Sequence, residues 1–430
     1  MEYGLPASMC GLLMKRYLVL FALFVLSLIT YIDRVAIASA KGPLAEDLSL
    51  SDQAMGMVFS AFALGYALAQ IPSGWFADRF GPRLALALVV TAWSLLTALT
   101  GLVQGLVVLL VVRFLFGIGE AGAFPGSARA IFNWLPVSER GRANGILFSG
   151  SRLGGAVAFP LLAWMLQHFG WRSSFIYLGV IGFVWAVFWF FWFHDQPDQR
   201  PSQNEPEVKT QLSFGEVFRS RDMILNMFQY FAGNFTFFIC LSWMLPYLKE
   251  HYHLSAATAA SYAMIPLLFG ATAQWVAGWM VDALYRSRLR PWSRRLPAIA
   301  GFFLAVAGML AITQANSAIM AVACFALATF GADMTISPSW AYCIDIGGTK
   351  SGAISGSMNM FGNFGSFVSA NAFPLLHDLT GSANTYFVVA ALLNLSAIGC
   401  WWGMRPWSMA GGDLENTVLI EGAGSSKPAL

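Results

Sequence analysis

The sequence has few charged residues and few of the residues that build catalytic or metal centres. Charged side chains make up 11% of its 430 residues, whereas hydrophobic side chains make up 57%. A chain with so little polar surface does not stay in water as soluble globules. Its five cysteines and five histidines form no CxxC or HExxH pattern. A disulfide framework, a zinc site and a metal-dependent enzyme are therefore not indicated.

Two further motifs are missing. The sequence has no GxxxxGK[ST] phosphate loop, and its glycines are scattered through apolar runs. It also has no contiguous patch of basic and aromatic residues, although its formal net charge is +3. ATP-driven transport and nucleic-acid binding are therefore not favoured, and no cofactor is expected.

Long apolar runs recur along the whole chain. About 30 Å of hydrocarbon requires roughly 20 residues of helix, and a barrel would show a period-2 alternation that these runs lack. We therefore predict an all-α membrane protein with twelve transmembrane helices. The predicted spans are 17–39, 53–77, 83–103, 106–130, 143–166, 173–193, 222–248, 256–281, 297–315, 317–342, 351–376 and 383–403.

The basic residues are distributed unevenly between the predicted loops. Most of the 25 Lys and Arg residues fall on one side, whereas the other side keeps only Lys41, Arg172 and Lys249. Short cytoplasmic loops retain basic residues, so the pattern predicts that both termini are cytoplasmic. Contact with anionic lipids fits the same loops.

A polar segment divides the chain into two halves. Residues 194–211 are rich in Pro, Gln and charge, so they cannot bury a core. Six predicted spans precede this segment and six follow it. We predict an N-terminal bundle at 1–193, a cytoplasmic linker at 194–221, and a C-terminal bundle with a short cytoplasmic tail at 222–430.

One decapeptide recurs at the same place in both halves. AQIPSGWFAD at 69–78 and AQWVAGWMVD at 273–282 share Ala, Gln, Gly, Trp and Asp at identical spacing. Each copy ends the second predicted helix of its half. Such internal similarity is typical of transporters built from two repeats.

The first copy continues into a short loop with a recognisable pattern. Gly74, Asp78, Arg79, Gly81 and Arg83 occur at the spacing of the loop signature of the major facilitator superfamily, which the chain resembles. The resemblance implies a cytoplasmic gate.

The segment ERGR at 139–142 resembles the matching loop after the fourth helix of that superfamily, and it adds Arg140 to the expected gate. The second copy of the decapeptide lacks the following Arg and Gly residues. This weakens the expectation that its aspartate, like Asp78 with nearby cations, holds the cytoplasmic ends of the helices together.

Several charged residues lie inside the N-terminal spans, four of them well inside the first and fourth spans. Retaining a charge there costs at least about 2.5–3.5 kcal/mol, so Asp33, Arg34, Arg113 and Glu120 are candidates for function. Arg113 and Glu120 share one face of the fourth helix, where they could also form a merely structural salt bridge. Asp33 and Arg34 diverge by about 100° and so suit different partners.

Further polar residues accompany them. Arg152 follows Ser151 among small residues, and Asp333 lies well inside the tenth span, whereas Arg129 is expected to extend towards water. Several guanidiniums suit an anionic cargo, because Arg can grip a carboxylate with two donors. Thr335, Ser337 and Trp340 lie around Pro338, where a broken helix would expose hydroxyls to the pocket. Asn359 and Asn363 are the other expected C-terminal contributors, although helix packing explains these two amides equally well.

The intramembrane motifs resemble one branch of the superfamily. YIDR at 31–34, RFLFGIGE at 113–120 and GAFP at 122–125 look like the anion:cation symporters, which include bacterial galactonate, glucarate and hexuronate importers. The resemblance implies proton sites at Asp33 and Glu120, and cargo contacts at Arg34, Tyr66 and Arg113.

The same resemblance implies a monomeric carrier in a bacterial inner membrane that imports a sugar acid with protons. The galactonate type has a glutamine where this sequence has Ser151 and Arg152. This difference leaves the cargo open among hexonates, hexarates, hexuronates and other carboxylates such as aromatic or amino-acid-like anions, and sodium coupling stays an alternative. If Arg152 faces the cargo, the extra cation favours a second carboxylate, as in a glucarate-like diacid.

Other classes of function are less favoured. An exporter would carry a Gly-Pro pattern in the fifth helix, where this chain has GGAVAFP at 154–160. A non-transporting nutrient sensor would be expected to carry a large soluble tail. A membrane enzyme would need a nucleophile and base, or a metal set, that the sequence does not offer.

Overall fold

The computed structural model describes residues 7–196 and 213–404. The greater part of the expected linker, the first six residues and the expected C-terminal tail lie outside these ranges. The first half contains α1 (Ala7–Ser39), α2 (Lys41–Asp47), α3 (Asp52–Phe80), α4 (Pro82–Thr100), α5 (Leu106–Glu120), α6 (Ala123–Trp134) and α7 (Arg140–Trp192).

The second half is also helical throughout its described residues. It contains α8 (Phe214–Arg219), α9 (Arg221–Ser242), α10 (Met244–Tyr252), α11 (Ala256–Tyr285), α12 (Arg295–Ile312), α13 (Ala318–Met334), α14 (Ile336–Gly347), α15 (Ser351–Thr380) and α16 (Asn384–Gly403). Equivalent helices begin alike in the two halves. The Ser51 side chain caps α3 by accepting a hydrogen bond from the N–H of Ala54, and the Ser255 side chain caps α11 by accepting one from the N–H of Thr258.

The twelve predicted spans correspond to these helices with a few interruptions. The fourth span is α5 plus α6, the seventh is α9 plus α10, and the tenth is α13 plus α14. The fifth and sixth spans form the continuous α7, which Gly170 bends with a φ of 72°. Gly81, at φ 82°, turns the chain between α3 and α4, as its place in the loop signature predicts.

The lengths of the apolar helical segments agree with twelve membrane crossings. Within the described residues, nine helical segments are long and apolar enough to span a membrane, and Val137–Trp192 and Ala318–Thr380, with 56 and 63 residues, each have room for two crossings. The remaining span contains α9, which the buried amides Asn226 and Gln229 make less apolar. The predicted all-α fold is confirmed.

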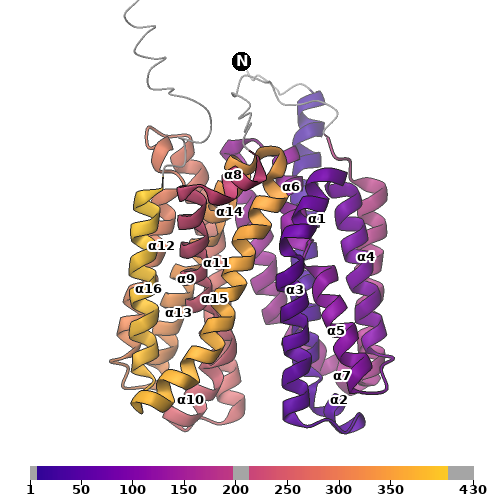
Figure 1. Cartoon of the computed structure of the whole chain (residues 1–430), viewed down its shortest axis with the longest axis vertical. Coiled ribbons are helices and arrows are strands. Elements are labelled where there is room, and N and C mark those ends of the chain that lie inside the picture. The colour runs from indigo at the N-terminus through magenta and orange to yellow at the C-terminus, as the bar shows by residue number, and fades with distance from the viewer. Residues whose placement is uncertain (1–6, 197–212, 405–430) are drawn as a thin grey trace, which may run out of the picture.

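The two halves lie side by side in Figure 1, with α1–α7 in indigo to magenta and α9–α16 in red to yellow. They meet where α3 packs along α15 and where α7 packs along α11. Both contacts join a helix that carries a copy of the repeated decapeptide to a helix of the other half. The repeat therefore lies at the seam between the halves.

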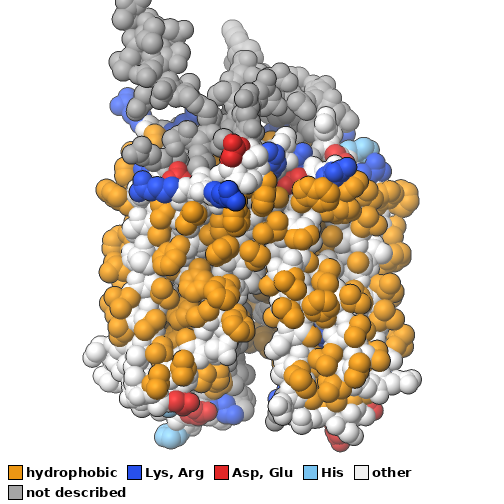
Figure 2. All heavy atoms as spheres, viewed as in Figure 1, with side chains coloured by type: hydrophobic (Ala, Val, Ile, Leu, Met, Phe, Trp, Pro, Cys, Tyr) orange, Lys and Arg blue, Asp and Glu red, His pale blue; other side chains and the backbone are white. Residues whose placement is uncertain are grey.

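Hydrophobic side chains cover the sides of the molecule between two polar ends (Figure 2). We call one end the basic end; there α3 meets α4 and α7 begins, and it includes Arg79, Arg83 and Arg142. The opposite end carries α2 and α10 (Figure 1). Figure 2 shows a hollow between the halves that opens at this opposite end.

Candidate functional site

The charged residues of α1 and α5 meet in the interior. The Arg34 Nε donates to Glu120 Oε1, and the Glu120 side chain is fully buried. The Arg34 guanidinium also lies 5.1 Å from the ring centre of Tyr31 and 4.4 Å from that of Tyr66. The alternative prediction of a salt bridge between Glu120 and Arg113 is therefore wrong, because Glu120 pairs with Arg34 instead.

Asp33 and Arg113 complete this N-terminal cluster. Asp33 is buried, and neither of its carboxylate oxygens has a hydrogen-bond partner among the described residues. The Arg113 guanidinium lies 5.1 Å from the Phe62 ring centre and 4.5 Å from that of Phe116, within electrostatic range of both acids. The structure thus brings the four predicted charges together in a setting of aromatic rings.

Arg152 is held by an acid of the other half. Its Nε and Nη2 donate to the two carboxylate oxygens of Asp333 at 2.8 and 2.5 Å, and both side chains are buried. Its Nη1 lies 3.4 Å from the Tyr31 hydroxyl, and the guanidinium lies 3.7 Å from the Phe237 ring centre. The neighbouring Ser151 Oγ donates to Phe148 O of its own helix instead.

The predicted amides of α15 lie next to the same cluster. Asn359 Nδ2 donates to the Tyr66 hydroxyl at 3.3 Å and to Gln70 Oε1 at 3.0 Å, which joins the two halves. Asn363 Nδ2 donates to Asn359 O, within its own helix. Asn359 is therefore the amide that reaches the candidate site.

The residues around Pro338 that were predicted to line the pocket are buried, and each of them donates a hydrogen bond within the protein. Thr335 Oγ1 donates to Ala332 O of its own chain segment, and Ser337 Oγ donates to Gly141 O across the seam at 2.6 Å. Trp340 Nε1 donates to the Tyr230 hydroxyl at 2.8 Å. The Trp340 ring also packs against Phe124 and Phe148 of the first half, so Trp340 and Ser337 join the halves in this state.

Sequence reasoning missed two residues that link these groups. Tyr31 contacts Arg34 through its ring and Arg152 through its hydroxyl, although it stands only two residues before Asp33. Gln70 contacts Asn359, and its presence in the repeated decapeptide was a usable signal.

The basic end is sealed by two equivalent aspartates. Asp78 accepts from the N–H groups of Gly352 and Ala353 at the start of α15, both at 2.8 Å. Asp282 accepts from the N–H groups at 141 and 142 at the start of α7, at 2.9 and 3.0 Å, and from Arg142 Nε at 3.0 Å. The weakened expectation for the second copy is therefore wrong, because Asp282 latches through backbone donors that the sequence pattern does not reveal.

A further ion pair, Arg140 with Asp345, joins the halves at this end. Arg140 Nη1 and Arg294 Nη2 bind the two oxygens of Asp345 at 2.7 and 2.9 Å. Arg129 Nη1 donates to Gly348 O at 3.3 Å, so Arg129 contacts the other half instead of extending to water as expected.

Arg79 and Arg83 behave differently from the other expected gate residues. Arg79 is exposed, and its guanidinium lies over the rings of Trp75 and Phe80. Arg83 donates from Nε to Phe190 O at 2.7 Å and from its backbone N–H to Asp195. These contacts stay within the first half and the start of the linker, whereas Asp78 and Arg140 bind across the seam.

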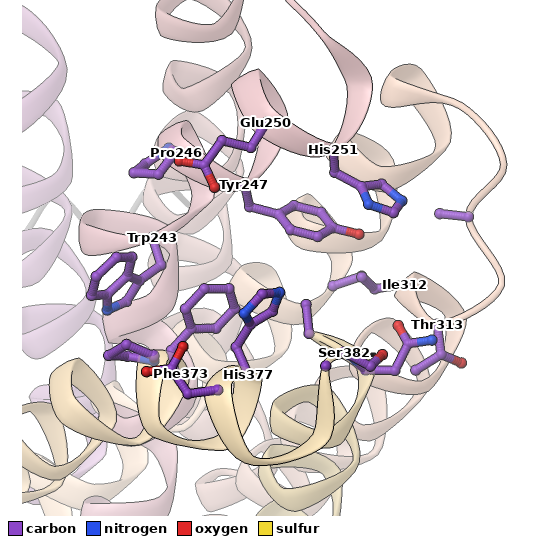
Figure 3. A pocket seen from close by; sticks show the side chains of 16 residues that line it. Trp243, Pro246, Tyr247, Glu250, His251, Ile312, Thr313, Phe373, His377 and Ser382 are labelled. Carbon is purple, nitrogen blue, oxygen red and sulfur yellow. Dashed lines mark hydrogen bonds between the residues drawn. The ribbon is translucent and has the colours of Figure 1, made fainter.

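A separate cavity of about 450 Å³ lies in the second half near the opposite end (Figure 3). It is lined by α10, the end of α15 and the loops beside them, and its lining includes Trp243, Tyr247, Glu250, His251, Phe373 and His377. None of the residues predicted from the sequence lines it. In the described part of the chain, no group of three or more His, Cys, Asp and Glu could hold a metal ion.

Comparison with curated proteins gives relatives along nearly the whole chain. A probable sulfoacetate transporter of Cupriavidus necator is 34% identical, and the match covers 89% of this chain and 92% of that protein. A probable L-galactonate transporter of Escherichia coli is 33% identical, with 86% and 84% covered. A hexuronate transporter of Bacillus subtilis is 29% identical, with 93% and 98% covered.

Solved structures share the fold. The human organic anion transporter MFSD10 has a TM-score of 0.73 at 14% identity, with 90% of this chain and 99% of that chain covered. The transporter FucP has a TM-score of 0.71 at 13% identity, with 89% and 97% covered. The family model of the Major Facilitator Superfamily matches residues 23–370. This multi-pass membrane protein therefore belongs to the Major Facilitator Superfamily.

Proposed function

We propose that the protein is a secondary active transporter that imports an organic anion, and that this anion is a sugar acid carried together with protons. The observation that carries the proposal is Arg34, whose side chain is 20% exposed and whose Nη2, itself a buried atom, has no hydrogen-bond partner among the described residues. A guanidinium with an unused donor is suited to a carboxylate. The names of the relatives, a galactonate and a hexuronate transporter among them, support the cargo class.

The proposed cargo contacts surround Arg34. Arg113 adds a second positive charge, and Tyr66 and Asn359 add polar groups at the seam. Because these groups come from both halves, a cargo that binds them is sensitive to how the halves are arranged. An antiporter or a carrier of another carboxylate would use the same groups, and the cargo panel below separates these cases.

The proposed proton sites are Asp33 and Glu120. Burying a carboxylate without a partner is costly while it is charged, and binding a proton removes that cost. Asp33 has no partner for either oxygen, and Glu120 Oε2 has none either, among the described residues. When Glu120 takes up a proton, it loses its ionic hold on Arg34, which frees that cation for the cargo.

The proposed transport cycle moves one bundle against the other. Residues 1–193 and 222–430 are the two moving bodies, and 194–221 is the linker between them. By the distribution of basic residues the basic end faces the cytoplasm of a bacterial cell, so both termini are inside and the hollow in Figure 2 faces outwards. The seal at Asp78 and Asp282 must open to release cargo inwards. The proposed unit is the monomer in the inner membrane.

The test is uptake by the purified protein in proteoliposomes. A panel of labelled hexonate, hexarate, hexuronate, sulfoacetate and an aromatic acid is offered under an inward proton gradient, and in parallel under a sodium gradient. We expect concentrative uptake of a sugar acid with the proton gradient only. Arg34→Gln should abolish this uptake. The control Arg172→Gln should not, because Arg172 pairs with Asp47 in an exposed bridge at the opposite end.

Three results would overturn parts of the proposal. Uptake of no acid by the wild-type protein would remove the transport function. Accumulation driven by sodium alone would remove the proton coupling. Full activity of Arg34→Gln would remove the role of the cation that carries the argument.

A further inference from the structure

Three arginines near the centre, the buried Arg113 and Arg152 and the partly exposed Arg34, differ in how many of their donors are used. Arg34 has an unpartnered Nη2 and Arg113 an unpartnered Nε among the described residues. Arg152, by contrast, directs Nε and Nη2 to Asp333 and Nη1 to the Tyr31 hydroxyl. In this state Arg152 is fully occupied by an internal carboxylate.

The space beside the pair is too small for a cargo group. The cavity lined by Arg152, Asp333, Tyr230 and Asn234 has a volume of about 10 Å³. That is close to the minimum needed for one water molecule. A carboxylate or sulfonate therefore cannot join the pair, and it can reach Arg152 only by replacing Asp333.

Arg34 and Arg152 contact the same side chain, that of Tyr31. The Arg34 guanidinium lies 5.1 Å from the Tyr31 ring centre, and Arg152 Nη1 lies 3.4 Å from the hydroxyl of the same side chain. Both arginines belong to the first half, whereas Asp333 belongs to the second. A molecule with an anionic group at each end could therefore bind both arginines and separate Arg152 from the other half.

We propose that Asp333 is an internal stand-in for a second anionic group of the cargo, so that the protein selects dianions over monoanions. The inference rests on the proposed function and names its substrate class more closely. When the second anionic group takes the place of Asp333 on Arg152, an ion pair between the halves is lost. A cargo with two anionic groups thereby favours the rearrangement of the halves, whereas a monoanion leaves the pair in place.

The test compares matched pairs of cargo that differ in one anionic group. One pair is a six-carbon hexarate and hexonate, and the other is sulfoacetate and glycolate, each measured as proteoliposome uptake. The deciding variant is the double substitution Arg152→Gln with Asp333→Asn, which leaves no unpaired buried charge. We expect the wild-type preference for the dianion of a pair to fall by at least about tenfold, with monoanion uptake changed less than about twofold.

Single variants and a control sharpen the result. Asp333→Asn alone should lower the KM for the dianion, because Arg152 is released, and Arg152→Lys should give an intermediate preference, because the two-donor fork is lost. The control is Arg142→Gln with Asp282→Asn, another pair across the seam, which should change both members of a cargo pair alike.

The outcomes separate the inference from the function on which it rests. If the wild-type protein takes up no member of either pair and no other acid, both are overturned. If it transports acids but the double variant at Arg152 and Asp333 keeps the wild-type preference, only the inference is overturned. A wild-type protein that prefers monoanions would also overturn the inference alone.

Discussion

Asp78 and Asp282 occupy equivalent positions in the two halves, and each accepts hydrogen bonds from two successive N–H groups at the start of a helix in the other half. The first N–H groups of a helix have no partner within it, and the helix dipole favours negative charge there. Each aspartate therefore stabilises the sealed basic end through charge and through two hydrogen bonds at once.

Asp78→Asn and Asp282→Asn should weaken this seal by similar amounts. Hydrogen bonds to a charged group contribute about 1.5–3 kcal/mol, so each variant should shift the balance towards opening at the basic end by about ten- to a hundredfold. The shift can be measured as thiol labelling of Ser355→Cys, a buried position, in a protein freed of its native cysteines. Asp47→Asn, an exposed acid at the opposite end, serves as the control, and an unchanged labelling rate in Asp282→Asn would remove the equivalence.

Gly74→Ala should prevent the basic end from closing. A Cβ at position 74 would run into the backbone carbonyl of Gly352, which cannot rotate away as a flexible side chain could. We expect transport to be lost and labelling of Ser355→Cys to increase. Gly399→Ala is the matched control, because nothing lies within 4 Å of a Cβ there. Transport by Gly74→Ala at the wild-type rate would show that α3 and α15 can separate enough to accommodate the extra methyl group.

Glu120→Gln should uncouple transport from protons. Glutamine keeps a hydrogen-bond acceptor for Arg34 but cannot exchange a proton, so accumulation under a proton gradient should be lost while exchange of labelled for unlabelled cargo continues. Both activities can be measured in the same proteoliposomes. Concentrative uptake at the wild-type level would exclude Glu120 as a proton site.

Trp340→Ala should reduce stability strongly. Trp340 is fully buried and packs against Phe124 and Phe148 of the other half, and truncating such a side chain costs about 3–5 kcal/mol. Trp340→Phe keeps most of the packing and loses the bond to the Tyr230 hydroxyl, so it should cost about 1 kcal/mol. Apparent melting temperatures in detergent measure the order of stability of the wild-type protein and the two variants. Equal losses in the two variants would mean that packing across the seam contributes little.

The fold could be predicted from the sequence because its signals are local. Apolar length fixes where each span lies, and Gly81 and the decapeptide mark the same turn and seam that the structure has. The break at Trp243 was not predicted, because Trp is not a strong breaker of helices by itself, whereas the break at Thr335 lies three residues before Pro338, where a broken helix was expected. Packing against neighbouring helices decides such breaks.

The site was predictable in its members but not in its pairings. Helical periodicity gives the face on which Glu120 lies, but it does not tell which helix that face meets, and the partner proved to be Arg34, 86 residues away. The same limit hid the bond between Arg152 and Asp333, which are 181 residues apart. Asp282 was undervalued for another reason, because its partners are backbone N–H groups that leave no mark in the sequence.

The polar face of α9 has a consequence for how the second half is assembled. Gln229 Oε1 accepts from Trp401 Nε1, and the hydroxyl of Thr236 accepts from Asn394 Nδ2, over separations of 172 and 158 residues. Both partners lie on α16, which is synthesised long after α9. Polar groups in hydrocarbon need partners, so we expect α9 to reach its final place in the bilayer only once α16 has joined it. We therefore expect the assembly of this half to be completed by its last helix.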